Sequence, residues 1–172
     1  MRSPVARSWA RWLVLSAVVV VLDLATKAWV SAAFQYGETR EVTPFFNLVL
    51  VHNTGAAFSF LAGAGGWQRW FFTLVAIAIS AVLVVMLRRN HGNALLACAL
   101  ALVLGGALGN LHDRVSLGYV VDFVQLHAAG HYFPAFNVAD SAITAGVALI
   151  IWDSVRPASH AAERAAATQE KP

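Results

Sequence analysis

Four long apolar segments constrain what this chain can fold into more than any other feature of its sequence. They run from Trp12 to about Phe34, from Trp70 to Leu87, from Ala94 to Leu111 and from about Asn137 to Trp152. As a helix, each covers most of the ~30 Å of membrane hydrocarbon at a rise of ~1.5 Å per residue. The 172 residues therefore predict an all-α membrane protein with four transmembrane helices in one domain, residues 1–155. Residues 156–172 are rich in alanine with scattered charge, and we expect a frayed or disordered cytoplasmic tail.

The first segment also has the pattern of a cleaved export signal. Three arginines precede its apolar stretch, and Ser31-Ala32-Ala33 resembles a cleavage site between small residues. Against that interpretation, Asp23 and Lys27 interrupt the apolar region one helical turn apart, and a cleaved signal has no use for such a pair. We therefore expect the segment to stay in the protein as a spanning helix.

Basic residues predict how the helices are oriented. On one side of a four-span arrangement lie Arg2, Arg7, Arg11, Arg88, Arg89, His91, Arg156 and Arg164. Because Lys and Arg are enriched on the cytoplasmic side of membranes, we expect both termini to be cytoplasmic. The net charge of +3 then reflects topology. Short basic clusters beside the spans favour contact with anionic membrane lipids and not with nucleic acid.

Two further patterns concern packing. β-Branched and aromatic residues between Val42 and Ala57, with Pro44 and a turn at Asn53-Thr54-Gly55, predict a short hairpin or small sheet outside the membrane. Gly105 and Gly109 form a GxxxG pair in the third segment, which predicts that a neighbouring helix approaches closely there.

Polar residues gather at the outer boundary of the predicted bundle: Asn110, Asp113, Arg114, Asp122 and Asp140. Some have a structural interpretation. Asn137 is a good N-cap, and Asp140 would then complement the start of the fourth helix. Asp113 and Arg114 fit an ion pair in a loop.

Asp23 and Lys27, at positions i and i+4, would neutralise each other or brace a neighbouring helix. Asp122 is harder to explain as structural, because it lies among valines and Phe123 with no cation nearer in sequence than Arg114. Gly130 and Pro134 interrupt the stretch between Asp122 and Asp140 and would let the chain fold back.

Asp122 and Asp140 would form an acid–base pair if the fold brings them together. Two carboxyl groups within a few ångströms do not both ionise cheaply, so one keeps a proton while the other can accept one from water. Aspartic proteases use this arrangement to activate water against a peptide carbonyl. The spacing permits such a pair without proving it.

Five short motifs in this chain occur in the order that one family shows. They are Asp23-Leu24-Ala25-Thr26-Lys27, Asn53-Thr54-Gly55-Ala56-Ala57-Phe58, Gly109-Asn110-Leu111-His112-Asp113-Arg114, Val121-Asp122-Phe123 and Phe136-Asn137-Val138-Ala139-Asp140-Ser141-Ala142-Ile143. The set resembles lipoprotein signal peptidase, the signal peptidase II family, from the first span to the fourth. One departure is Phe133, where we expect Trp, and it affects the shape and lipid contacts of the outer loop more than the chemistry.

The resemblance implies a bacterial inner-membrane aspartic protease that cuts a diacylglyceryl-modified prolipoprotein just before its modified cysteine. Asp122 and Asp140 would be catalytic. Residues that line or brace the site would be Asn53, Gly55, Asn110, Asp113, Arg114 and Asn137, and Asp23 and Lys27 would support it. The implied fold adds a small outer β-cradle, at about residues 35–66, and a short amphipathic outer helix. The site would lie near the periplasmic face of a chain acting as a monomer, and its chemistry requires no metal or cofactor.

Other classes fit the residues less well. His127 and His131 are four apart but enclose no Glu, so a zinc protease motif is absent. Ser141 has no evident base for serine peptidase chemistry. A proton-coupled carrier would also use buried acids, but it predicts internal symmetry or broken helices, and neither is evident. A purely structural scaffold leaves the polar motifs without a purpose.

Overall fold

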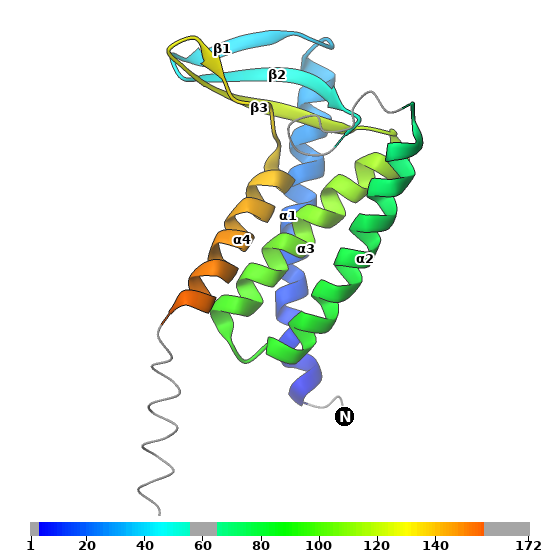
Figure 1. Cartoon of the computed structure of the whole chain (residues 1–172), viewed down its shortest axis with the longest axis vertical. Coiled ribbons are helices and arrows are strands. Elements are labelled where there is room, and N and C mark those ends of the chain that lie inside the picture. The colour runs from blue at the N-terminus through cyan, green and yellow to red at the C-terminus, as the bar shows by residue number, and fades with distance from the viewer. Residues whose placement is uncertain (1–3, 56–64, 157–172) are drawn as a thin grey trace, which may run out of the picture.

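The computed structural model describes residues 4–55 and 65–156, and this part of the chain forms four long helices and one small sheet (Figure 1). The helices are α1 (Pro4–Ala33), α2 (Trp67–Asn90), α3 (Ala94–Ser116) and α4 (Val138–Val155). Each is long and apolar enough to cross a membrane. The four predicted spans are therefore confirmed, although α1 begins at Pro4 and not at Trp12, and α3 continues to Ser116, past the predicted Leu111.

Helix α3 lies at the centre of the bundle, where it packs against each of the other three helices (Figure 1). Many of its buried residues are small: Ala97, Ala99, Ala101, Gly105, Gly106 and Gly109. In lipid, small side chains favour helix association because they let two backbones come close. The composition of α3 thus explains its central place.

Gly105 and Gly109 face α1, which confirms the predicted close approach. A Cβ atom on Gly105 would lie 2.7 Å from the Cβ of Val19, and one on Gly109 would lie 2.6 Å from Oδ2 of Asp23. Ser16 adds an interhelical hydrogen bond by donating to the carbonyl of Ala101 at 2.8 Å. The glycines therefore bring the polar residues of α1 and α3 into contact.

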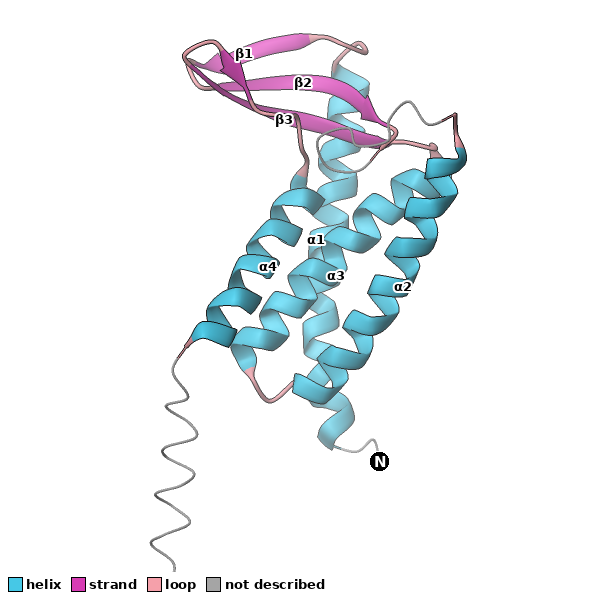
Figure 2. Ribbon diagram, in the orientation of Figure 1, coloured by secondary structure: helices cyan, strands magenta, loops and turns pink. Residues whose placement is uncertain are grey.

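A four-stranded antiparallel sheet covers one end of the bundle (Figure 2). Its strands, in spatial order, are β1 (Thr39–Thr43), β2 (Phe46–Asn53), β3 (Val120–Ala128) and β4 (His131–Tyr132). The sheet is fixed to the end of α1 by an apolar cluster that comprises Val30, Phe34, Leu50, Val121 and Phe123. This end of the bundle is the one at which α1 ends and α4 begins (Figure 1).

The predicted hairpin turns at Pro44 and Phe45, and Asn53-Thr54-Gly55 forms a second turn where β2 ends. The described residues of the predicted segment 35–66 supply β1 and β2, but β3 and β4 come from further along the chain and were missed. The first four residues of β3 are all buried, so the alternation of polar and apolar residues that marks a half-exposed strand is missing there.

The chain folds back between β3 and α4, as expected. Ala129 (φ 48°) and Gly130 (φ 81°) turn the chain from β3 into β4. The returning segment then pairs with β3, because Val124 donates to the carbonyl of Phe136 at 2.8 Å and Phe136 donates to the carbonyl of Val124 at 2.9 Å. This pairing sets the start of α4 beside β3.

Some expectations concern residues that the structure does not describe. The predicted tail falls outside the described residues from position 157 onward. The short amphipathic outer helix that the resemblance implied is not among the elements of residues 4–55 and 65–156.

Candidate active site

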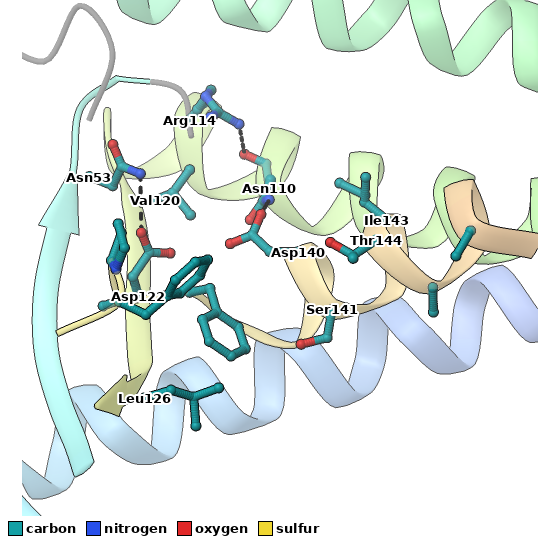
Figure 3. Close-up of a pocket in the computed structure, with 16 residues that line it drawn as sticks. Asn53, Asn110, Arg114, Val120, Asp122, Leu126, Asp140, Ser141, Ile143 and Thr144 are labelled. Atoms are coloured by element: carbon teal, nitrogen blue, oxygen red, sulfur yellow. Dashed lines mark hydrogen bonds between the residues drawn. The ribbon is translucent and has the colours of Figure 1, made fainter. Parts of the chain in front are cut away.

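Five of the predicted site residues line one cavity of about 710 Å³ between the sheet and α4: Asn53, Asn110, Arg114, Asp122 and Asp140. They come from β2, α3, β3 and α4, so the cavity depends on the whole fold. Figure 3 shows their side chains converging, with the carboxyl groups of Asp122 and Asp140 turned toward each other. The fold thus brings together residues that are far apart in the sequence.

Asp122 is almost fully buried, with 3% of its surface exposed. Asn137 Nδ2 donates to its Oδ1 at 2.7 Å, and Asn53 Nδ2 donates to its Oδ2 at 3.1 Å. Burial, and after it the charge of Asp140, raises the pKa of Asp122 to about 7, although both hydrogen bonds act to lower it. At neutral pH this carboxyl group is poised between its protonated and ionised forms.

Asp140 has both of the roles that the sequence left open. It is the N3 residue of α4 in a capping box: Asn137 Oδ1 accepts from the Asp140 amide at 2.9 Å, and Asp140 Oδ2 accepts from the Asn137 amide at 3.3 Å. Its other oxygen accepts from Asn110 Nδ2 at 2.7 Å. The cap holds the carboxyl group at the mouth of the cavity, so capping and site geometry do not compete.

Asn137 joins the two acids and is itself fully buried. Its amide group bonds to Asp122, while its backbone and side chain form the cap with Asp140. Asn137 Nδ2 also lies 3.2 Å from Asn110 Oδ1 and 3.2 Å from the Val121 carbonyl oxygen. One side chain therefore ties β3, α3 and α4 together at the point where the two carboxyl groups meet.

Behind the cavity lies the Lys27 cluster, which consists of Lys27, Asp23 and Asp113. The ammonium nitrogen of Lys27 is 2.7 Å from Asp23 Oδ2 and 2.9 Å from Asp113 Oδ2, and all three side chains are buried. Lys27 also donates to Asn110 Oδ1 at 3.0 Å, which turns the amide nitrogen of Asn110 toward Asp140. The predicted pairing of Asp23 with Lys27 is confirmed, and Asp113 is a further partner.

The Lys27 cluster also holds the two elements that carry the cavity acids. Asp23 Oδ1 accepts from the Ala139 amide in α4 at 2.8 Å. Asp113 Oδ2 accepts from the Val121 amide in β3 at 3.1 Å. Each acid of the cluster thus fixes a backbone position next to one acid of the cavity.

The expected loop ion pair between Asp113 and Arg114 was wrong, since both residues lie in α3. Asp113 points to Lys27, whereas Arg114 donates to the carbonyls of Gly55 at 3.2 Å and Asn110 at 3.3 Å. Gly55 in turn donates to Asn53 Oδ1 at 2.9 Å. Arg114 and Asn53 therefore hold the turn that follows β2 against the cavity.

Comparison with known proteins identifies the family. The family model described as signal peptidase (SPase) II matches residues 15–156. The chain belongs to the signal peptidase II family. A protein named lipoprotein signal peptidase from Paraburkholderia phymatum is 50% identical over 157 residues, which are 91% of this chain and 94% of that protein. A protein of the same name from Cupriavidus necator is 54% identical over 145 residues, 84% of this chain and 83% of its own length.

Solved structures agree with the family. A bacterial membrane enzyme determined by the in meso method at 2.3 Å resolution matches with a TM-score of 0.78 and 35% identity, over 88% of this chain and 91% of that one. A second, at 1.9 Å resolution, matches with a TM-score of 0.75 and 35% identity, over 86% and 94%. As a member of the signal peptidase II family with four apolar helices, the chain is a bacterial membrane protease.

Other lining residues of the signal peptidase II cavity were missed from the sequence. One wall, between β3 and α4, contains Leu126, Phe133, Pro134, Ala135 and Phe136, and α4 adds Ser141, Ile143, Thr144, Ala145 and Ala148. The α4 group could have been found, because helical residues three, four and seven positions apart share a face. The residues of the wall between β3 and α4 could not have been found from the sequence, because their positions depend on β3 and β4.

Among the residues that the structure describes, no three or more His, Cys, Asp or Glu side chains are placed to hold a metal ion. What the arrangement offers chemically is a pair of carboxyl groups surrounded by neutral amide donors.

Proposed function

We propose that this chain is an aspartic endopeptidase that removes the signal peptide from prolipoproteins, just before their diacylglyceryl-modified cysteine. One observation carries the proposal: Asp122 and Asp140 face one cavity and share Asn137 as a hydrogen-bonding partner. The substrate class rests on the relatives that carry the name lipoprotein signal peptidase.

The pair works with one proton. The ionised carboxylate takes a proton from a water molecule as that water attacks the peptide carbonyl carbon, and the protonated carboxyl group donates to the carbonyl oxygen. When the tetrahedral intermediate collapses, the C–N bond breaks and the first carboxyl group protonates the leaving amine. The second carboxylate recovers the hydroxyl proton, so the pair regains its single proton. A pKa of about 7 for Asp122 supports a retained proton at neutral pH.

The surrounding side chains orient the reactants. Asn110 and Asn137 direct the two carboxyl groups, because each donates to one of them through its amide nitrogen at 2.7 Å. Asn53 and Arg114 lie at the cavity surface, where they hold substrate backbone or lipid head group. Gly55 anchors the turn beside them, and the Lys27 cluster supports the scaffold from behind.

We place the protein in the bacterial inner membrane with both termini in the cytoplasm and the cavity near the periplasmic face. Arg11, Arg88 and Arg156 lie toward the bundle end opposite the sheet, which fits the enrichment of basic residues on the cytoplasmic side. A signal peptide that crosses the bilayer as a helix would then present its cleavage point at the level of the pair, while its lipid stays in the membrane. Residues 1–155 act as one peptidase domain.

One chain suffices for the reaction. Both acids and their amide donors come from the same polypeptide, so we propose a monomer whose partners are the prolipoprotein and membrane lipids. Neither a cofactor nor a nucleic acid has a part in this mechanism.

The test is cleavage of a lipidated, signal-bearing prolipoprotein by the purified protein in detergent. Asp122→Asn and Asp140→Asn should each reduce cleavage by a factor on the order of 10³ or more, as loss of an essential acid–base group does, while thermal unfolding shows that the protein stays folded. Retained turnover in either variant would refute the assignment. Proton flux through liposomes without cleavage by the parent protein would favour a proton-coupled carrier instead.

A further inference from the structure

Helix α2 lines no part of the cavity, yet its outer end touches the helix that supplies Arg114. Arg69, in the first turn of α2, reaches across to the last turn of α3. Its Nε donates to the carbonyl of Arg114 at 2.8 Å, and its Nη2 donates to the carbonyl of Val115 at 2.7 Å. The planar guanidinium group thus binds two neighbouring backbone oxygens at once.

These two oxygens are ones that a helix leaves unpaired at its C-terminal end. The next two amides, of Leu117 and Gly118, both donate to the carbonyl of Asp113, at 2.7 Å and 3.2 Å. The carbonyls of Arg114 and Val115 are therefore bound by Arg69. Cationic side chains stabilise the negative end of a helix dipole, so charge and geometry favour the same contact.

Gly118 packs against the guanidinium group that makes this contact. Its φ is +88°, and a Cβ atom there would lie 3.2 Å from Nη1 of Arg69. The turn from α3 into β3 is thus fitted to the arginine, and it leads directly to the strand that carries Asp122.

Helix α2 also supports the side chain of Arg114. Phe72, about one helical turn after Arg69, has its ring 5.6 Å from the guanidinium carbon of Arg114. The main chain of Arg114 is held by Arg69, and its side chain lies over Phe72. This is how a helix outside the cavity contacts a residue that lines it.

We propose that Arg69 is a positioning residue for the peptidase site. Its guanidinium group fixes the last turn of α3, and through Arg114 and Asp113 it also fixes the turn after β2 and the start of β3. The proposal rests on the proposed function. Arg114 holds the Gly55 carbonyl, and Asp113 holds the Val121 amide beside Asp122. If the last turn of α3 shifts, Asp122 moves relative to Asp140, which α4 carries.

Replacing Arg69 should therefore lower kcat markedly while changing the thermal unfolding midpoint little. A misplacement of about 1 Å can cost about a hundredfold in rate. We expect Arg69→Ala to reduce kcat at least about tenfold. Arg69→Lys should fall between Ala and the parent, because an ammonium group can reach one carbonyl but lacks the planar fork that binds both.

Arg88 provides the matched control. It lies on the same helix and its guanidinium carbon is 4.6 Å from the Trp9 ring, much as that of Arg69 is 4.9 Å from the Trp70 ring, but it sits at the opposite end of α2. Arg88→Ala and Arg88→Lys should keep kcat within about twofold of the parent. The assay uses the full chain in detergent with the lipidated prolipoprotein, beside thermal unfolding of each variant.

The pH–rate profile separates positioning from a general loss of folded protein. Asp122 is affected chiefly by burial and by Asp140, and also by Asn53, Asn137 and Lys27. If Arg69→Ala moves Asp122 away from Asp140, the alkaline limb shifts to lower pH. A lower amplitude with an unchanged limb, in proportion to lost folded protein, would show a structural role only and overturn the proposal.

Other outcomes are equally decisive. Arg69→Ala with parent-like kcat overturns the proposal, and if that variant does not fold, Arg69→Lys decides by the same two criteria. If Asp122→Asn loses cleavage while the Arg69 variants keep the kcat of the parent, the proposed function stands and only this inference fails. If the parent protein does not cleave the substrate, the proposed function fails first.

Discussion

Two pairs of acids lie next to each other in this molecule, and they differ in the groups that bind them. Asp23 and Asp113 share the ammonium group of Lys27, at 2.7 Å and 2.9 Å. Asp122 and Asp140 are bound by neutral amides and face a cavity. The first pair therefore shares a cation, whereas each acid of the second pair has amide donors and another carboxyl group beside it.

The comparison shows how one protein uses the same side chain in two ways. The carboxylate oxygens of the Lys27 cluster bind Lys27 and accept hydrogen bonds from the backbone amides of Ala139 and Val121. These two acids therefore hold α4 and β3 in place. The acids of the cavity keep a side open to that cavity. Under the proposed function, whether an aspartate is structural or reactive here depends on its neighbours and on access, and not on burial alone.

The largest expected effect on stability comes from Lys27→Met, which removes the cation from the first pair. Two buried carboxyl groups then lose their partner, and breaking a buried ion pair in this way costs about 3–5 kcal/mol. Denaturant or thermal unfolding in detergent measures the loss. Asp153→Asn is the control, since Asp153 makes an exposed contact with Asn93 at the end of the bundle away from the sheet, and it should change stability by less than about 0.5 kcal/mol. Equal effects for the two variants would contradict the role given to Lys27.

A smaller effect is expected where the Lys27 cluster is packed against glycine. Gly109→Ala would place a Cβ atom 2.6 Å from Asp23 Oδ2, and we expect it to destabilise the protein by about 1–3 kcal/mol. Gly92→Ala is the matched control, because no atom lies within 4 Å of its added Cβ. Thermal midpoints of the two variants, measured side by side, check the difference. A tolerated Gly109→Ala would mean that α1 can move away from α3 without cost.

The pH dependence of activity should follow the pKa of Asp122 in the cavity pair. Because the pKa of Asp122 is raised to about 7, the cavity pair keeps its proton below that pH and loses it above, so kcat/KM should fall about tenfold per pH unit on the alkaline side. Between the ordinary value of 3.8 and about 7, the folded protein binds more protons than the unfolded chain, so the free energy of unfolding falls as pH rises. Asp122→Asn should remove the part of that slope that Asp122 contributes. Activity that stays constant from pH 6 to pH 9 would contradict the shared proton.

The smallest expected effect concerns the hydrogen bond between Asn53 and Asp122. Asn53 donates to Asp122, and this bond lowers the pKa of that carboxyl group. Asn53→Ala should therefore move the alkaline limb of the pH–rate profile to higher pH. An opposite shift would mean that the bond favours the protonated acid. Full pH–rate profiles of the variant and the parent, run with the same substrate, decide the sign.

The four spans could be predicted because apolar length is a local property of the sequence. Asp122 and Asp140 could be singled out because acids in apolar surroundings are costly, and the ordered motifs linked them to a family. Strand β3 was harder to recognise. Its first residues are buried on both faces, so it lacks the alternation that reveals a strand from a single sequence.

Long-range partners could not be read from spacing. Asp113 and Arg114 look like a local ion pair in the sequence, yet both lie within α3. Asp113 pairs with Lys27 of α1, and Arg114 donates to the carbonyl of Gly55 in the turn after β2. Such choices depend on how helices pack. The small residues of α3 bring α1 close enough for Lys27 to reach, which is a property of the assembled bundle.

The pairing of Val124 with Phe136 has a consequence for inhibition. Asp140 belongs to α4 and Asp122 to β3, and this β-bridge joins β3 to the segment that enters α4. A small molecule bound between β3 and the start of α4 would hold the two carboxyl groups apart. If these groups act as the proposed pair, such a compound would inhibit cleavage without mimicking a peptide.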